Sequence, residues 1–421
     1  MSGTDAAAQG QATAHALDGV RVLDLSRVLA GPWCAQMLGD LGADVIKVEA
    51  LTGDDTRAWG PPFLPPADGQ GRGESAYYLS ANRNKRSITI DFTKPEGVAL
   101  VKKLALKADI LVENFKVGGL QRFGLDYASL AAIRPSLVYC SITGYGQDGP
   151  YAGRGGYDFV AQGMGGIMSI TGHPDGEPGG EPMKAGVAIC DLFTGVYAAT
   201  AVLAALRHAE RTGEGQHIDC CLLDSQVAML ANQGMSYLVG GVVGQRIGNA
   251  HPTVVPYRLF HGADGDMVIA VGNNRQFKAL CAVIGRPDIY DDPRFATNTD
   301  RIHNRAALEA GLAEALAGFE VAPLIERLSD AGVPAGPINT IDKVFADPHV
   351  KHRAMAGEIA RADGSQVPSV AYPPKLSKTP ADYRRPPPRL GEDTLQVLRD
   401  ELGLDAADCA RLAAEGVIGT R

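Results

Sequence analysis

The group with the clearest potential for chemistry in this sequence of 421 residues is the carboxylate of Asp191. It follows the apolar run AIC and opens a long apolar segment, so it falls near the expected start of a helix. The first turn of a helix stabilises a charged carboxylate, which can act as a nucleophile. Gly195, one turn further on, would leave room for a substrate. On spacing alone an ordinary N-cap is the stronger interpretation, because Asp is among the commonest capping residues.

A second carboxylate, Asp158, stands beside Tyr157 after the flexible run GRGG. Two carboxylates in one site support general acid–base chemistry. A long stretch of chain separates Asp158 from Asp191, and the sequence does not establish whether they meet.

The run NRNKRS (82–87) places Arg83, Lys85 and Arg86 just before an apolar strand. Cations at such a spacing can clamp phosphate groups. A solvated run of charges is an equally good interpretation.

The run ENF (113–115) ends an expected strand, and ligands of open parallel sheets gather at the carboxyl ends of strands. Phe115 would there cover an adenine ring, and Asn114 would hydrogen-bond it. A simple turn at the end of the strand is the alternative.

Weaker candidates lie further along the chain. GNNRQF (272–277) follows an apolar strand and is either a mobile lid or a polar loop. His251 stands beside a proline, a setting in which histidine is more often structural than catalytic. Arg275 and His251 are weak candidates for holding a second carboxylate of a substrate.

Strands and helices alternate along the first half of the chain. GVRVLDLS, ADVIKVEA, SITIDFT, DILVENF and SLVYCSITGYG are expected strands, and helical segments such as WCAQMLGDLGA, after a Gly31-Pro32 turn, lie between them. This order predicts an α/β fold with a doubly wound, largely parallel sheet. The loop after the first strand, SRVLAGPW, lacks G-x-G-x-x-G, so no dinucleotide is expected there.

The pattern also predicts the domain organisation. Residues 1–17 are small and polar and form a disordered extension rather than a signal peptide. A large domain begins at 18–225, a smaller domain occupies 226–330, and 331–421 returns to the large domain. The proline-rich arm YRRPPPRLGEDT cannot pair in a central sheet, so it should run over a surface.

Composition excludes several classes of function. The net charge of −8 offers no bulk attraction for nucleic acid. The seven cysteines are scattered without a C-x-x-C pair, which predicts neither a metal site nor a disulfide framework and fits a reducing cytoplasm. Outside the first residues, no apolar run is expected to reach the roughly 18–20 residues of a membrane span.

Several ordered strings together resemble the class III CoA-transferases (the CaiB/BaiF family, which includes formyl-CoA and carnitine CoA-transferases). They cover about residues 18–418 and include LDGVRVLDLSRVLAGPWCAQMLGDLGADVIKVE, NRNKRSITIDFTKPEG, DILVENF, SITGYGQDGPYAGRGGYD, AICDLFTG, TGEGQHIDCCLLDSQ, VPAGPINT and PPPRLGE. Within the family the chain looks most similar to succinyl-CoA-dependent dicarboxylate transferases of the succinate–hydroxymethylglutarate type.

The resemblance implies a homodimer of two interlocked rings, with a Rossmann-like large domain, a smaller α+β domain and Asp191 as the nucleophile. It also implies the residues that contact coenzyme A: Val28, Leu29, Ile90, Asp91, Asn114, Phe115 and Arg122. Two departures put an oxalate or formate substrate in doubt. Leu29 stands where formyl-CoA transferase has a glutamine, and the family's glycine-rich loop is not recognisable before Tyr257.

The implied reaction moves coenzyme A from an acyl-CoA, expected to be succinyl-CoA, to a free acid through an aspartyl anhydride and an aspartyl-CoA thioester. Exchange between thioesters is nearly isoenergetic, so no metal or other cofactor is expected beyond the CoA thioester substrate. The acceptor is expected to be a dicarboxylate of four to six carbons or an aryl-substituted succinate. The cations that could read its distal carboxylate are Arg27, Arg83, His251 and Arg275.

Two alternatives stay open. Alpha-methylacyl-CoA racemases resemble the chain around GYD, but they carry a histidine where Tyr157 stands, and tyrosine is a poor acid–base substitute near neutral pH. A non-catalytic CoA-binding subunit of a heteromer is the second alternative, which an intact Asp191 argues against.

Overall fold

The computed structural model describes residues 15–66 and 69–420, which divide into two compact units. Of these described residues, unit 1 combines 15–66, 69–165, 186–234 and 351–420, and unit 2 combines Gly166–Ala185 and Met235–Val350. The predicted extension lies outside the described residues up to residue 14. Its last residue, Leu17, is buried in the core of unit 1, so the extension ends earlier than expected.

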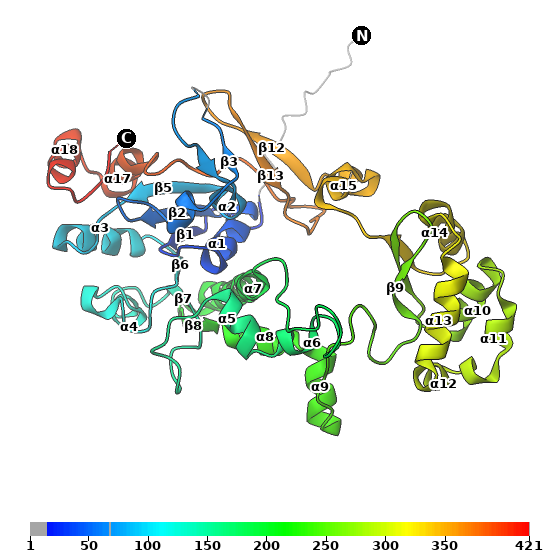
Figure 1. Ribbon diagram of the computed structural model, residues 1–421. Helices are drawn as coiled ribbons and strands as arrows, with labels where there is room; N and C mark the ends of the chain where they lie inside the picture. The colour runs from blue at the N-terminus through cyan, green and yellow to red at the C-terminus, as the bar shows by residue number, and fades with distance from the viewer. Residues whose placement is uncertain (1–14, 67–68, 421) are drawn as a thin grey trace, which may run out of the picture. The chain divides into compact units, whose positions relative to one another are not determined.

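A six-stranded, fully parallel sheet forms the centre of unit 1, which confirms the predicted α/β architecture (Figure 1). The strand order is β5-β2-β1-β6-β7-β8, so the chain winds outward from β1 in both directions. The strands are β1 (Arg21–Asp24), β2 (Asp44–Glu49), β5 (Lys85–Thr89), β6 (Ile110–Glu113), β7 (Val138–Thr143) and β8 (His217–Cys221).

Alternating apolar side chains bury both faces of this sheet. Val22 faces a core formed with α1, α7 and α8, whereas its neighbour Leu23 faces a core formed with α3, α4, α17 and α18. A strand places successive side chains on opposite faces, so apolar residues at every position require helices on both sides. The helices of unit 1 are α1 (Ala30–Asp40), α2 (Ala76–Ser80), α3 (Pro95–Ala105), α4 (Tyr127–Ala131), α5 (Asp158–Met164), α7 (Ile189–Thr212), α8 (Leu222–Met229), α17 (Thr394–Leu402) and α18 (Ala406–Ala414).

Short elements complete unit 1. They are the 3-10 turns η1 (Asp55–Ala58) and η2 (Gln121–Phe123), the strand pair β3 (Phe63–Leu64) and β4 (Glu74–Ser75), and the hairpin β12 (Ala356–Ala360) and β13 (Gln366–Val370).

Unit 2 has its own antiparallel sheet, in the order β11-β10-β9, and its own apolar core. Its strands are β9 (Tyr257–His261), β10 (Asp266–Ala270) and β11 (Ala335–Pro337). Its helical elements are α6 (Ile167–Ile170), α10 (Asn274–Val283), α11 (Pro287–Asp291), η3 (Pro293–Phe295), α12 (Asn298–His303), α13 (Arg305–Leu316), α14 (Val321–Asp330) and α15 (Ile341–Ala346). Two helices, α9 (Ala231–Gly240) and α16 (Pro348–His352), cross from one unit to the other along the chain.

These units differ from the domain boundaries that the sequence pattern predicts. The smaller unit extends past residue 330 because β11 pairs with β10, so VPAGPINT does not return to the large unit. It also takes in Gly166–Ala185, which the pattern assigns to the large domain. The chain does return to unit 1 from Lys351 onward.

The proline-rich arm runs along the edge strand β5 without forming a strand of its own. The backbone N–H of Asn84 donates to the carbonyl of Arg385 at 2.9 Å, and the N–H of Ser87 donates to the Asp393 carboxylate at 2.9 Å. The arm therefore covers an edge that would otherwise expose unpaired backbone groups.

Two local expectations are wrong. Gly31-Pro32 lies inside the first turn of α1 rather than in a turn before it, a place where proline is tolerated because the first N–H groups have no partner within the helix.

The 24-residue α7 has the length and apolar composition of a membrane span, contrary to the expectation that no such run exists. Its residues Cys190, Ala198 and Val202 pack in the core of unit 1.

Candidate active site

Asp191 is the third residue of α7, as the sequence predicts for the start of a long helix. It is not the N-cap, because Ala188 holds that position and makes no capping hydrogen bond through its side chain. The carboxylate of Asp191 therefore does not cap the helix.

Gly195, one turn after Asp191, serves packing rather than substrate access. A Cβ atom there would lie 2.7 Å from the carbonyl oxygen of Ala30 and 3.1 Å from Cδ1 of Trp33. The expectation that it leaves room for a substrate is wrong, since α1 fills that space. The glycine lets α1 and α7 approach closely, which fixes where the start of α7 lies on the sheet.

Asp158 and Asp191 do meet, which the sequence left open. Oδ1 of Asp158 accepts from the N–H of Cys190 at 2.8 Å and from the N–H of Asp191 at 3.3 Å. Oδ2 of Asp158 accepts from Nε2 of Gln162 at 2.6 Å. Asp158 thus occupies the anion-binding position at the N-terminus of α7.

This arrangement changes the electrostatics expected for Asp191. Burial and the nearby charge of Asp158 raise the pKa of Asp191 to about 7. The expectation that the helix start simply stabilises the charged form is wrong, because the free N–H groups bond Asp158. Asp191 is instead a carboxyl group that ionises near neutral pH, as reactive groups in enclosed sites often do.

Tyr77, which no pattern in the sequence singles out, lies close enough to Asp191 and Asp158 for their charges to raise its pKa. Burial, followed by the charges of Asp191, Asp158 and Asp54, raises the pKa of Tyr77 to about 12. Its ring lies edge-on to Trp59, with 5.1 Å between the ring centroids. The phenol therefore stays protonated near these carboxylates and can donate a hydrogen bond. Tyr157, by contrast, is 69% exposed.

The loop after β1 is held in place by side chains from two other segments. The side-chain amide of Asn114 accepts from the backbone N–H of Arg27 at 2.9 Å and donates to its carbonyl at 2.7 Å. The N–H of Val28 lies 3.2 Å from a carboxylate oxygen of Asp54. Asn114 thus braces the loop with one of the two N–H donors of its amide, and its contact with coenzyme A stays a prediction.

Val28 adopts a backbone conformation that β-branched residues rarely take. Its φ is +72°, in the left-handed region. Such strain persists only where surrounding contacts over-determine it, and it clusters at ligand-binding segments. Leu29 follows as the N-cap of α1 and is buried, with 6% of its surface exposed.

Most of the other predicted CoA contacts gather beyond the carboxyl ends of β5 and β6. Phe115 packs edge-on against Phe92, with 5.8 Å between centroids, and the guanidinium of Arg122 lies 4.5 Å from the ring centroid of Phe123. Asp91 caps the following turn by accepting from Thr93 at 2.6 Å. Ile90 is fully buried and pairs with Ile418, so its side chain is not available to a ligand.

The cations of NRNKRS are structural, so the phosphate-clamp interpretation does not fit. Arg83 forms a double contact with Asp40, at 2.8 and 2.6 Å. Lys85 is buried in β5 and contacts Asp24 at 2.9 Å. Arg86 pairs with two carboxylates, those of Asp44 and Glu401. The solvated-run interpretation is equally wrong, since all three side chains are buried.

The remaining substrate-binding candidates have ordinary surroundings. Arg27 is exposed and pairs with exposed Asp55 at 2.9 Å. In unit 2, Nδ1 of His251 accepts from the N–H of Thr253 at 3.1 Å, a local structural bond. Arg275 is exposed in the first turn of α10, which begins directly after the N-cap Asn273. GNNRQF therefore opens a helix rather than forming a separate lid.

Comparison with known proteins identifies the family. A model described as CoA-transferase family III matches residues 17–394. The chain belongs to this family. It is a CoA-transferase, and its parallel α/β sheet is the family's fold.

Two curated CoA-transferases are similar over nearly the full length. The succinate–glutarate CoA-transferase of Agrobacterium fabrum is 51% identical over 385 residues, covering 91% of this chain and 95% of its own. The human succinyl-CoA:glutarate CoA-transferase is 42% identical over 403 residues, covering 96% and 90%. A crystal structure of a CaiB/BaiF family protein from Brucella suis superposes with a TM-score of 0.81 at 49% identity, covering 92% of this chain and 99% of that one.

Proposed function

We propose that this CoA-transferase uses Asp191 as its nucleophile. The observation that carries this proposal is the position of Asp191: a half-buried carboxyl at the start of α7, with its pKa raised to about 7 beside Asp158. Near neutral pH a large fraction is ionised and able to attack a thioester. The protonated phenol of Tyr77 is available to stabilise the oxyanion that develops on the attacked carbonyl.

The proposed reaction runs through two covalent intermediates. The Asp191 carboxylate attacks the donor thioester, and the C–S bond breaks to give an acyl–aspartyl anhydride and CoA thiolate. The thiolate attacks the aspartyl carbonyl and releases the donor acid, which leaves an aspartyl-CoA thioester. The acceptor carboxylate attacks this thioester, and the expelled thiolate then attacks the acceptor acyl carbon. Asp191 is regenerated with no net uptake of protons and no cofactor besides the CoA thioester.

We propose succinyl-CoA as the donor and a dicarboxylate of about five carbons, such as glutarate, as the acceptor. The names of the two similar CoA-transferases, both of which act on succinate or succinyl-CoA and glutarate, support this choice. Arg27 is the candidate in unit 1 for the distal carboxylate, since it is exposed and Arg83 is paired internally. The coenzyme would lie at the carboxyl ends of the strands, against Val28, Leu29, Asp91, Phe115 and Arg122.

The test is a transfer assay with isotopically labelled succinyl-CoA and a panel of carboxylic acids, followed by mass spectrometry of the thioesters. Glutaryl-CoA should form in the wild type, and Asp191→Asn should abolish its formation. Glu210→Gln is the matched control, because Glu210 is exposed near the opposite end of the same helix. Hydroxylamine added during turnover should leave a hydroxamate on Asp191. Turnover at the wild-type rate in Asp191→Asn would exclude this residue as the nucleophile.

We also propose that the protein is a homodimer of interlocked chains and works in the cytoplasm. Each unit exposes large apolar side chains, as surfaces that form protein contacts do. On unit 1 they include Phe159, Phe193 and Tyr197, and on unit 2 Leu238, Val239 and Val243, which are 75%, 80% and 71% exposed. The seven cysteines are free thiols, which fits a reducing compartment. Light scattering of the purified protein should give twice the chain mass, and Leu238→Lys should lower it.

A further inference from the structure

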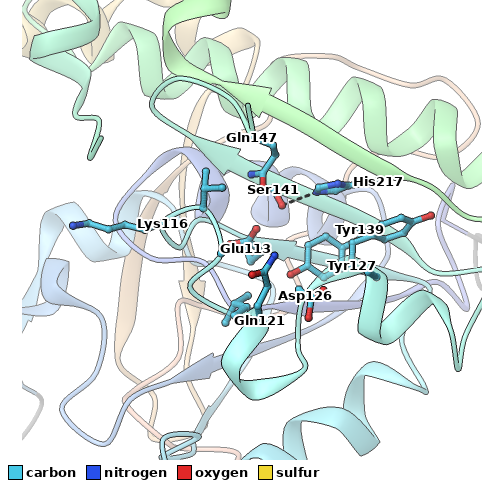
Figure 2. A pocket seen from close by; sticks show the side chains of 13 residues that line it. Glu113, Lys116, Gln121, Asp126, Tyr127, Tyr139, Ser141, Gln147 and His217 are labelled. Atoms are coloured by element: carbon cyan, nitrogen blue, oxygen red, sulfur yellow. Dashed lines mark hydrogen bonds between the residues drawn. The ribbon is translucent and has the colours of Figure 1, made fainter. Parts of the chain in front are cut away.

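A cavity of about 270 Å³ lies on the face of the large sheet that α7 does not cover (Figure 2). Its floor is formed by the side chains of Glu113, Tyr139, Ser141 and His217 from β6, β7 and β8, and the segment 116–128 forms its walls. Tyr139 packs in the core of this face, whereas α7 packs in the core of the other face. The cavity is therefore separate from the site of Asp191.

Glu113 is the unusual side chain in this cavity. It is 5% exposed, and one of its carboxyl oxygens accepts from the N–H of Phe115 at 2.7 Å. Within residues 15–66 and 69–420, no Lys, Arg or His forms an ion pair with it. The other buried carboxylates of that range each have such a partner: Asp24 with Lys85, Asp40 with Arg83, Glu49 with Arg57, Asp54 with Lys47, Glu309 with Arg258 and Asp393 with Arg385.

The surroundings of Glu113 suit a positive charge. Burial raises the pKa of Glu113 to about 7 even though Ser141 and the N–H of Phe115 hydrogen-bond its carboxylate, so an added cation would complete its ionisation. Burial also lowers the pKa of His217, so its ring is neutral near pH 7 and does not compete as a cation. A ring nitrogen of His217 hydrogen-bonds the Ser141 hydroxyl at 2.9 Å. Asp126 adds a second carboxylate to the lining, and Figure 2 shows the side chain of Lys116 directed away from Glu113.

Two tyrosine rings also line the cavity, beside aliphatic and amide side chains such as Leu120 and Gln147. The ring of Tyr127 stacks on His217 at 5.1 Å, and the ring of Tyr139 lies 5.9 Å from Tyr127. Ring faces attract organic cations and shield their apolar parts from water. The space is several times the roughly 30 Å³ of one water molecule. In the described part of the chain, no three His, Cys, Asp or Glu side chains are arranged to hold a metal ion.

We propose that this cavity binds a small organic cation, a primary ammonium carried on a short or flat apolar group, with Glu113 as its counter-ion. The ammonium would lie against Glu113, and the apolar part against Tyr127 and Tyr139. Such a ligand would give Glu113 the partner that every other buried carboxylate of the described chain has. Because the cavity adjoins the loop that carries Phe115 and Arg122, occupancy would stabilise that loop.

The test measures binding of benzylammonium chloride to the full-length protein by titration calorimetry, with benzyl alcohol as the neutral compound of similar shape. We expect saturable binding of benzylammonium and at least tenfold weaker binding of benzyl alcohol. Glu113→Gln should weaken benzylammonium binding at least tenfold. Glu96→Gln, which removes the same charge from an exposed site in the same unit, should leave it unchanged.

A second variant protects the test against misfolding of Glu113→Gln. Ala128 lines the cavity and is exposed, so Ala128→Trp should block the space while leaving the buried network intact. This variant should also weaken binding at least tenfold. Equal binding by wild type and both variants, equal binding of the alcohol, absence of binding to the wild type, or displacement by coenzyme A would each overturn the proposal.

Discussion

Two sets of carboxylates in unit 1 differ in their partners. Asp24, Glu49 and Asp54 lie near the ends of β1 and β2. Asp24 and Asp54 are each paired with a buried lysine, and Glu49 is paired with a half-buried arginine. Asp191 and Glu113 lie in the same unit, and burial raises the pKa of each to about 7. The ion pairs of the first set hold the strands of the sheet in place. The carboxyl groups of the second set ionise near neutral pH. Five experiments, in order of decreasing expected effect, test this contrast and the packing that holds Asp191 in place.

The largest effect is expected from Asp191→Asn. Transfer should fall by at least about 10³-fold, because the amide cannot act as the nucleophile. The same variant should have a higher melting temperature than wild type at pH 8. The folded-state pKa of Asp191 is raised, so its contribution to stability is present at low pH and is lost as the pH rises through about 7.

The melting temperature gives the sharpest comparison with the first set. Asp24→Asn should lower it at pH 8, since the ammonium groups of Lys85 and Lys47 overcome the effect of burial and hold the pKa of Asp24 below its ordinary value. The same change of Asp to Asn would then have opposite signs at the two sites. Equal destabilisation by both variants would contradict the division into two sets.

Removing Lys85, the cation of the Asp24–Lys85 pair, should lower the stability nearly as much as removing the carboxylate. Lys85→Met leaves Asp24 buried without its nearest cation and should lower the free energy of unfolding by about 3–5 kcal/mol. Lys103→Met, on the exposed face of α3, should change it by less than about 0.5 kcal/mol. Urea denaturation followed by circular dichroism measures both. A small effect for Lys85→Met would show that the pair is not structural.

A smaller effect is expected where α1 and α7 pack together. Gly195→Ala introduces a Cβ atom 2.7 Å from the carbonyl oxygen of Ala30, which should cost about 1–3 kcal/mol of unfolding free energy. It should also reduce the rate of transfer, because the start of α7 carries Asp191. Gly153→Ala, at a position with open space, is the control and should change neither quantity.

The smallest effect is a change in pH dependence. In wild type, kcat/KM should rise with pH through about 7 as Asp191 ionises. Asp158→Asn removes the neighbouring charge while keeping an oxygen that can accept from the N–H groups of α7. The midpoint should therefore move down by about 1 pH unit. An unchanged midpoint would show that another group controls the profile.

The sheet could be predicted from the sequence because each strand is short, apolar and followed by a turn. β5 shows the limit of that method. The sequence leaves Lys85 and Arg86 as either a phosphate clamp or a solvated run, yet their carboxylate partners lie on strands and a helix far away in the sequence. Periodicity describes neighbours along the chain, and it cannot reveal a compensating charge that folding brings from elsewhere.

The candidate site was predicted in part. Spacing placed Asp191 at a helix start, but only the family resemblance selected it as a nucleophile. The contact with Asp158 depends on the packing of α5 against α7, and Tyr77 comes from a third segment. No signal in the sequence links these three residues, since a tyrosine in a short helix such as AYYLS is common in protein cores.

The arm along β5 has a consequence for how the protein is made. Thr89 of β5 bonds Thr394, 305 residues later in the chain, and Figure 1 shows the C-terminal helix α17 beside β5. At typical rates of translation, the ribosome needs about 15–60 s to cover that distance. During this time unit 2, whose core residues lie between Val255 and Val333, can finish folding. Until the C-terminal residues are made, β5 has an unpaired edge, and apolar residues such as Ile88 stay exposed to solvent. Newly synthesised chains should thus depend on chaperones until the last residues emerge, and a short C-terminal truncation should reduce the yield of folded protein sharply.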